Sequence, residues 1–330
     1  MGNKKLKKMK KGKNNKTKYF IGIALALFCC YQMVHFLREN ENLNGEKWAI
    51  QVSGSVGYID YRHEADIAHA YQILRINGYK ESHVVVFMAD VAAGHGNNPR
   101  RGTLIHSDKT RDYYAGLPKD YCADNATQDN LIAVLLGHKL KIKGGSGKMI
   151  KTGPNDQIFF FYSGHGGEDR FQMPSPRFRS HIKKSVLANA LKKKHADGGY
   201  KSMVVYINSC LAGDIGMKIN PDLRIYILTC GAKREDCLAA YCNKEKGLKP
   251  PYPPKEYTVC VASEFGAAWM EHCEETDTTK VTLQQQFETV KKRVINSNVT
   301  QHGDLELAKQ KLSVYFGSSK HMNFAYDNDG

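Results

Sequence analysis

The sequence lacks the cysteine and histidine spacings by which small structural sites bind zinc. No paired Cys-x-x-Cys or His-x3-His motif occurs among its nine cysteines and thirteen histidines. It also has no internal repeat, and no long low-complexity tract follows the N-terminal tail. The spacings therefore predict no metal site, and the lack of a repeat argues against a solenoid or propeller.

Acidic residues are absent from the first eighteen positions, which carry nine lysines. Those lysines account for nine of the +15 formal net charge, so the rest of the chain carries +6, which is unremarkable for its size. A phosphate-binding footprint needs basic residues clustered on the fold itself. We therefore expect no nucleic-acid partner.

A mostly apolar run over residues 19–37 follows the lysines, interrupted only by Gln32 and His35. Its length can span a bilayer, and a basic segment before an apolar one is a cleaved signal peptide or a signal anchor. The small residues that a cleavage site needs fit poorly, so we favour an anchor that attaches the chain to a membrane. Residues 1–18 would be a cytoplasmic tail, residues 38–46 a linker, and the remainder would be lumenal, in the secretory pathway.

A lumenal location permits disulfides and N-linked glycosylation. Cys242 and Cys260 flank a loop that contains four prolines, and we expect a disulfide between them. Asn125 and Asn298 each begin an Asn-x-Thr acceptor, and we expect both to be glycosylated.

Strands alternate with helices after the linker. Apolar runs predict strands over residues 47–53, 82–88, 157–162, 203–207 and 223–229. Helical spacing predicts helices over residues 64–77, 128–140, 181–194 and 281–296. This order predicts an α/β fold with a mostly parallel sheet covered by helices on both faces.

A cysteine and a histidine follow two of these strands. Cys210 comes just after the strand over 203–207, and His165 follows the strand over 157–162 between glycines. In neighbouring parallel strands both side chains would lie at one sheet edge, where ligands bind. A single strand-end cysteine is usually only a small buried apolar residue, but the pair is the minimum for a thiol nucleophile and its base. The backbone N–H groups of Gly166 and Cys210 would hold the oxyanion. The other histidines considered receive no role and are predicted at ordinary surface or helix positions: His69, His83, His106, His138, His181 and His195.

Several further motifs resemble those of one enzyme family. They lie at residues 60–66 with 69–71, 119–121, 144–148, 153–156, 192–195 with 200–202, 250–257, and 269–271. With them the chain resembles the legumain family of asparaginyl endopeptidases, peptidase family C13, and most of all the plant vacuolar processing enzymes. The resemblance covers about residues 47–328, which we expect to form one peptidase domain.

The resemblance implies a caspase-like α/β fold with a sheet of about six strands. It also implies a thiol mechanism without a cofactor, in which Cys210 is the nucleophile and His165 the general base. The expected partners are protein or peptide substrates, cleaved after Asn and sometimes Asp through a thioester, in the lumen of a vacuole or lysosome. The oligomeric state is left open.

Departures from the family pattern fall at the site itself. The family's third catalytic residue, an Asn, corresponds to Asp60, whose carboxylate could still orient His165. Arg62 and His63 match the pocket for P1, the residue before the scissile bond. Three other pocket positions differ, because an acid, a serine and a second acid of the family correspond to Asn208, Cys237 and Ser263.

The resulting pocket keeps a cation and loses both acids. A desolvated arginine without a carboxylate partner favours a substrate that brings one, so we expect the P1 preference to shift from Asn towards Asp. In the alternative, Asp60 or Glu64 balances Arg62 and specificity is unchanged.

Two other functions remain open. Gly164 stands where legumains carry an Asp, and Ser-Gly-His-Gly-Gly resembles the motif of the transamidase that attaches glycolipid anchors and of metacaspases. A transamidase or peptide ligase, or a weakened relative that only binds peptides, would use the same residues. Plant relatives also carry a C-terminal domain that caps the site, and because this sequence stops at Gly330 we expect no such inhibitory prodomain.

Overall fold

The computed structural model describes residues 23, 27–28, 31–32, 45–175, 180–244 and 250–318. The chain forms two compact units, Met1–Glu46 and Lys47–Gly330, and the described fold lies in the second. Most of the predicted tail, anchor and linker falls outside the described residues. Within those that are described, no helix is both long enough and apolar enough to cross a bilayer.

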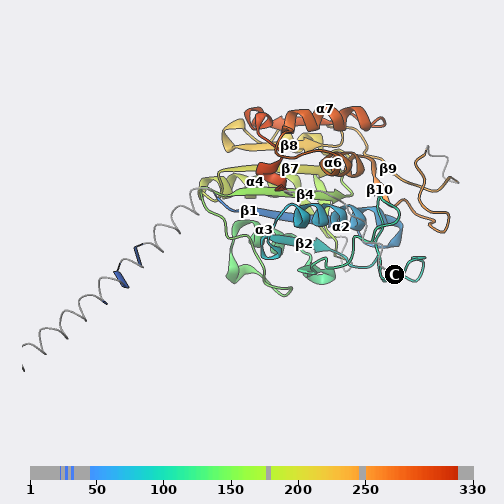
Figure 1. The fold of residues 1–330 in the computed structure, drawn as a ribbon, viewed down its shortest axis with the longest axis horizontal. Coiled ribbons are helices and arrows are strands. Elements are labelled where there is room, and N and C mark those ends of the chain that lie inside the picture. The colour runs from blue at the N-terminus through green and yellow to red at the C-terminus, as the bar shows by residue number, and fades with distance from the viewer. Residues whose placement is uncertain are drawn as a thin grey trace, which may run out of the picture. The chain divides into compact units, whose positions relative to one another are not determined.

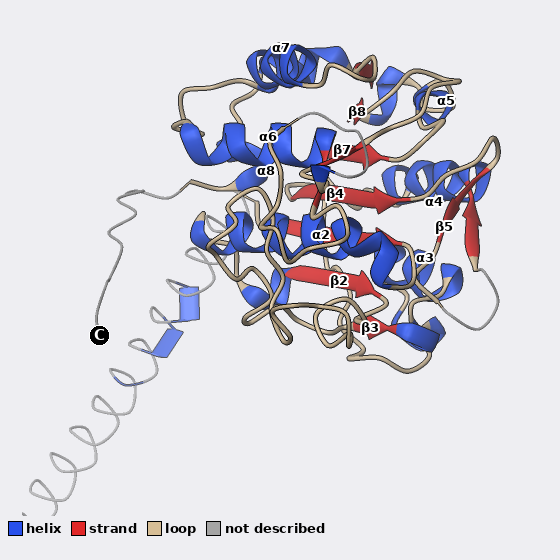
Figure 2. Cartoon of the chain, turned by 90° about the vertical axis from the view of Figure 1, so that its right-hand side faces the viewer, coloured by secondary structure: helices blue, strands red, loops and turns tan. Residues whose placement is uncertain are grey.

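A seven-stranded sheet forms the centre of the second unit, in the order β11-β8-β7-β4-β1-β2-β3 (Figure 1). Its strands are β1 (Lys47–Gly54), β2 (Val84–Met88), β3 (Tyr121–Cys122), β4 (Gln157–Gly164), β7 (Ser202–Asn208), β8 (Ile225–Thr229) and β11 (Thr300–Gly303). Every neighbouring pair is parallel except β8 with β11. The arrowheads of β2, β3, β4 and β7 point the same way (Figure 2). The predicted α/β class and mostly parallel sheet are confirmed, with seven strands in place of about six.

Helices cover both faces of the sheet. One apolar core joins it to α2 (Tyr61–Ile76), α6 (Glu264–Glu275), α7 (Leu283–Arg293) and α8 (Ser313–Phe316). The other joins it to α3 (Gln128–Leu136), α4 (Lys184–Ala196) and the short α5 (Gly213–Gly216). Successive strand residues alternate between the two cores, as Phe159 and Phe160 do on β4. Burial on both faces explains why the strands are continuously apolar.

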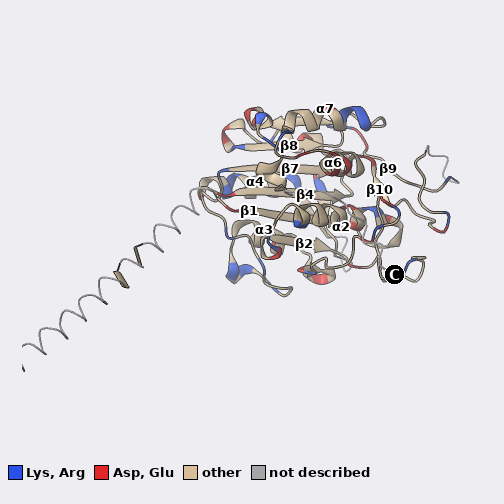
Figure 3. Ribbon diagram, in the orientation of Figure 1, with Lys and Arg blue, Asp and Glu red and all other residues tan. Residues whose placement is uncertain are grey.

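Two small hairpins complete the fold. β5 (Arg170–Gln172) pairs antiparallel with β6 (His181–Lys183), and β9 (Ala239–Ala240) with β10 (Ala262–Ser263). In the view of Figure 3, Lys and Arg segments lie among Asp and Glu segments on several elements.

Some predicted boundaries were wrong for local reasons. The helix predicted over 128–140 ends at Leu136, because Gly137 adopts a left-handed conformation with φ of 72°. The strand predicted to begin at residue 223 begins at Ile225, because Arg224 has φ of 55° after a 3-10 turn. The helix predicted from residue 181 begins at Lys184, since its first three residues form β6. Helix α6 and the weakly apolar strand β11 were not predicted.

Strand register determines where the functional side chains lie. Gly54 at the end of β1 pairs with Gly164 on β4, and Ser163 on β4 pairs with Asn208 on β7. The segments that follow β1, β4 and β7 therefore begin side by side at one edge of the sheet.

Candidate active site

His165 and Cys210 follow neighbouring strand ends that are in direct contact. Each lies two residues beyond the paired positions Ser163 and Asn208. A Cβ atom added to Gly166 would lie 2.3 Å from Oγ of Ser209 and 2.6 Å from the carbonyl oxygen of Cys210. Glycine at position 166 therefore permits the loop that carries His165 to lie against the segment that carries Cys210.

Asp60 contacts both His165 and Arg62 through a single oxygen. Its Oδ1 lies 2.9 Å from Nε2 of His165 and 3.3 Å from Nη1 of Arg62. The side chain of Asp60 is 14% exposed and that of His165 is 45% exposed. The bond to Nε2 fixes the orientation of the imidazole and leaves Nδ1 to accept a proton. Asp60 therefore lies where a residue that orients the base is needed.

Among the described residues, the acid that pairs with Arg62 is Asp60, through the same oxygen that faces His165. Glu64, the other candidate, accepts the N–H groups of Val91 and Ala92 at 3.1 and 3.0 Å. Its carboxylate therefore holds the loop after β2.

The backbone N–H groups of Gly166 and Cys210 are the ones that the sequence predicts to bind an oxyanion. Within the described residues, neither Gly166 nor Cys210 donates its amide hydrogen to a partner. Neighbouring amides are used instead: Gly167 donates to the carbonyl oxygen of Arg170 at 2.9 Å, and Leu211 to that of Glu235 at 2.8 Å. Leu211 has φ of 58°, a conformation that costs free energy for a side-chain-bearing residue.

The thiol of Cys210 is half-buried. The N–H of Cys237 donates to its Sγ at 3.4 Å. Burial raises the pKa of Cys210 above its ordinary value, although the Cys237 N–H and Arg62 oppose the shift. The resting group is therefore a thiol, and it needs a base to become a nucleophile.

An unpredicted disulfide joins Cys230 and Cys237 beside this thiol. The N–H of Ser209 donates to Sγ of Cys230 at 3.0 Å, and its carbonyl oxygen lies 3.2 Å from Sγ of Cys237. Cys237, which the sequence assigned to the P1 pocket, is therefore tied to β8 and holds the peptide unit before Cys210.

A second, predicted disulfide links Cys242 and Cys260, which confirms that expectation. Of the predicted glycosylation sites, Asn125 is half-buried, while Asn298 is exposed and donates from Nδ2 to Glu235. Glycosylation at either position stays a prediction.

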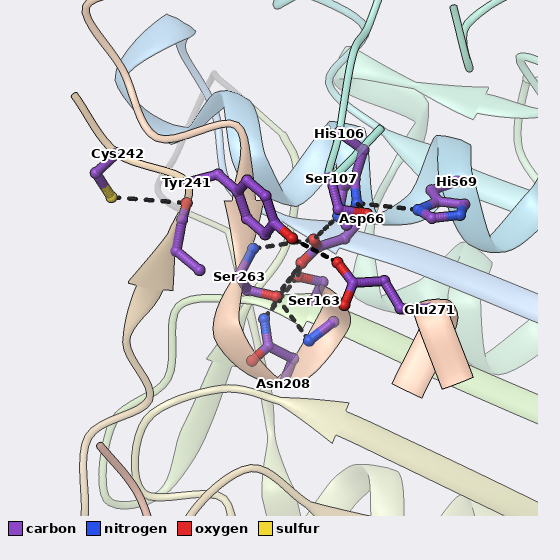
Figure 4. A network of polar contacts seen from close by, with 12 residues as sticks. Asp66, His69, His106, Ser107, Ser163, Asn208, Tyr241, Cys242, Ser263 and Glu271 are labelled. Carbon is purple, nitrogen blue, oxygen red and sulfur yellow. Dashed lines mark hydrogen bonds and ion pairs between the residues drawn. The ribbon is translucent and has the colours of Figure 1, made fainter. Parts of the chain in front are cut away.

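The other two pocket candidates surround a buried carboxylate that the sequence did not single out, Asp66 on α2 (Figure 4). Oδ2 of Asp66 accepts from Oγ of Ser263 at 2.5 Å, Oγ of Ser163 at 2.5 Å and Nδ2 of Asn208 at 3.3 Å. The hydroxyl of Ser263 is thus occupied. Oδ1 of Asn208 is buried, and no described group donates to it.

His69 lies on helix α2, in agreement with a predicted helix position, whereas His106 lies in a loop; both are fully buried, which the sequence did not indicate. His106 lies 2.8 Å from Oδ1 of Asp66, and Nδ1 of His69 lies 2.9 Å from Nδ1 of His106. Nε2 of His69 in turn lies 3.0 Å from Glu274. They form a polar chain from Asp66 to α6.

His63 is buried next to His165. Its Nδ1 lies 2.9 Å from Oγ of Ser55, which follows β1, and its ring lies 5.0 Å from that of His165 in an edge-to-face arrangement. Burial, Arg62 and His165 together hold the pKa of His63 well below its usual value. His63 is therefore a neutral imidazole.

An open cavity of about 570 Å3 begins at His165 and runs along the β5–β6 hairpin. Its lining residues are His165, Gly166, Gly167, Arg170, Gln172 and His181. The side chain of His165 is therefore open to a ligand from this cavity.

Sequence reasoning missed Ser55, Asp66, Ser209 and Cys230 at the site. Ser55 and Ser209 follow strands, and that position alone could have marked them. Asp66 lies within a helical pattern that gives no sign of burial, and Cys230 is separated from its partner by only seven positions in an irregular segment.

Comparisons with known proteins agree on one family. The model of the "Peptidase C13 family" matches residues 47–318. The chain is 45% identical to "Legumain" of Canavalia ensiformis over 83% of this chain and 58% of that protein. It is 44% identical to "Vacuolar-processing enzyme beta-isozyme" of Arabidopsis thaliana over 84% of this chain and 58% of that one. The chain thus spans less than two thirds of the length of these relatives.

Among solved structures, one similar to the chain is that of caspase-1 from Spodoptera frugiperda, with 12% identity and a TM-score of 0.49. The alignment covers 84% of this chain and 94% of that one.

Because burial raises its pKa, Cys210 should react with iodoacetamide only at high pH. The thiolate fraction falls when the pKa rises, so the alkylation midpoint should lie above the ordinary thiol value of 9.0. Mass spectrometry of the modified peptide across a pH series measures it. Cys122 and Cys273, whose pKa values are both raised to about 12, serve as internal references. A midpoint near neutrality would contradict this and would indicate a resting thiolate.

Removing the Cys230–Cys237 disulfide should expose Cys210. The double variant Cys230→Ser/Cys237→Ser should lose about 2 kcal/mol of unfolding free energy. It should also lower the alkylation midpoint of Cys210, because the loop would no longer bury the thiol. Cys242→Ser/Cys260→Ser is the matched control, in which stability falls but the midpoint stays. An equal midpoint shift in both double variants would show that the effect is not local.

Proposed function

The chain belongs to the peptidase C13 family, and we propose that it is a cysteine endopeptidase that cleaves protein substrates after Asn or Asp. One observation carries the proposal: the loop of the oriented base His165 is packed against the segment of Cys210. In these two segments the N–H groups of Gly166 and Cys210 have no acceptor among the described residues.

The reaction follows from these positions. Nδ1 of His165 accepts the Cys210 proton as Sγ attacks the carbonyl carbon of the scissile bond. The N–H groups of Gly166 and Cys210 donate to the oxyanion, and Asp60 stabilises the imidazolium. The imidazolium then protonates the leaving amine, which departs and leaves a thioester on Cys210. Water, deprotonated by His165, hydrolyses the thioester and restores the thiol.

A peptide library tests this function directly. The full chain should produce cuts after Asn or Asp, identified by mass spectrometry, and Cys210→Ala and His165→Ala should each lower the rate by about 10³-fold or more. Cuts that persist in the Cys210→Ala protein would refute the proposal. Joined peptides in place of cut ones would favour the transamidase alternative, because an amine would then outcompete water for the thioester.

We further propose that the P1 preference is shifted towards Asp. Arg62 contacts one carboxylate, Asp60, which it shares with His165. No other acid among the described residues forms an ion pair with it. The positions of the missing pocket acids offer only neutral groups, since Asn208 and Ser263 both donate to Asp66. A substrate carboxylate would supply the second partner of the guanidinium.

Peptides that differ only at P1 should therefore show a higher kcat/KM for Asp than for Asn at pH 7, where a substrate Asp is ionised. The advantage should shrink as the pH falls below about 4, because protonation removes the charge that Arg62 binds. Asn208→Glu should move the preference back to Asn, and Asn208→Gln is the matched control. A preference for Asn in the unmodified chain throughout pH 4 to 7 would overturn the proposal.

The names of the relatives support a vacuolar or lysosomal lumen as the site of action. Attachment to a membrane through residues 19–37 stays a prediction from the sequence.

A further inference from the structure

Three side chains at the catalytic edge are arranged as metal ligands, although their positions in the sequence show no metal-binding spacing. One carboxylate oxygen of Asp60 and one ring nitrogen each of His63 and His165 lie within 4.8 Å of one another. Donors at about 2.1 Å from a tetrahedral zinc ion are about 3.4 Å apart. The three atoms are therefore somewhat more widely spaced than in a formed site and would move closer together around an ion.

The surroundings of His63 favour metal binding by its ring. Oγ of Ser55 lies 2.9 Å from Nδ1 of His63, and both residues are buried. This contact determines which way the ring faces and leaves Nε2 as the remaining nitrogen. In metal sites the ligating histidine almost always bonds through its other nitrogen to an oxygen of the protein. Ser55 occupies that position here.

We propose that Asp60, His63 and His165 bind a Zn²⁺ ion that inhibits the enzyme. The ion takes the place of the hydrogen between Nε2 of His165 and Oδ1 of Asp60, and the ring proton moves to Nδ1, so that His165 stays a neutral imidazole. Two imidazoles and a carboxylate then leave the fourth position of the ion to water, as in sites with three protein ligands. His165 held in this way no longer serves Cys210 as an oriented base.

The sulfur of Cys210 is not part of this group. The proposed site therefore differs from the common case in which a metal inhibits a cysteine enzyme by binding the thiolate. Arg62 works against the ion, because its Nη1 lies 3.3 Å from the same oxygen of Asp60. Removing the positive charge should therefore tighten binding.

Zinc affinity of the full chain is measured by competition with a chromophoric chelator, and tetrahedral geometry by the visible spectrum of bound Co²⁺. The unmodified chain and Cys210→Ala should bind one ion with equal affinity. His63→Gln should weaken binding by about 100-fold and Ser55→Ala by about tenfold. Arg62→Gln should strengthen it by about tenfold. His181→Gln, an exposed histidine that lines the same cavity, is the matched control and should bind normally.

Loss of binding in Cys210→Ala, or unchanged binding in His63→Gln, would overturn the zinc site. The inhibitory part rests on the proposed function, and zinc should block peptide cleavage with the same dissociation constant as the chelator competition gives. Binding without any peptidase activity in the metal-free protein would refute the proposed function and leave the site standing. Cleavage that persists at saturating zinc would refute the inhibition.

Discussion

One carboxylate oxygen, Oδ1 of Asp60, accepts from both His165 and Arg62, so under the proposed function the base and the P1 pocket share one acceptor. The base keeps its orientation only while Asp60 stays in place, and Arg62 helps to hold it there. The guanidinium in turn has a carboxylate partner without the acids that the family's pocket carries. A half-buried arginine left without any partner would be costly. Asp60 is thus a partner that Arg62 shares with His165.

A second carboxylate, that of Asp66, connects several of the elements next to the site. Asp66 is inaccessible to solvent and accepts hydrogen bonds from β4, β7 and the β10–α6 junction, through Ser163, Asn208 and Ser263. Because a buried charge must be fully hydrogen-bonded, these contacts couple the ends of three elements to helix α2. The residues that looked like altered recognition groups thus support the position of the strands that carry His165 and Cys210.

The Cys230–Cys237 disulfide restrains the segment that carries Cys210. The Cys230–Cys237 disulfide contacts both the N–H and the carbonyl oxygen of Ser209. The peptide before Cys210 is therefore fixed by a covalent loop as well as by β7. A thiol held in this way is half-buried, which keeps it protonated at rest and makes its reactivity depend on His165.

The sequence by itself determined the α/β class, the parallel sheet, the Cys242–Cys260 disulfide and the positions of Cys210 and His165 at strand ends. Apolar runs and the breaks in them mark strands and their ends, the alternation of strands with helices indicates a parallel sheet, and the two cysteines flank one proline-containing loop. Tertiary structure alone decided the Cys230–Cys237 disulfide, the burial of His69 and His106 and the role of Asp66. It also brought together Asp60, His63 and His165, whose ligand atoms lie within 4.8 Å of one another although the motif spacing predicted no metal site. Each of these depends on which distant segments the strand register places side by side, and no pattern along the chain carries that information.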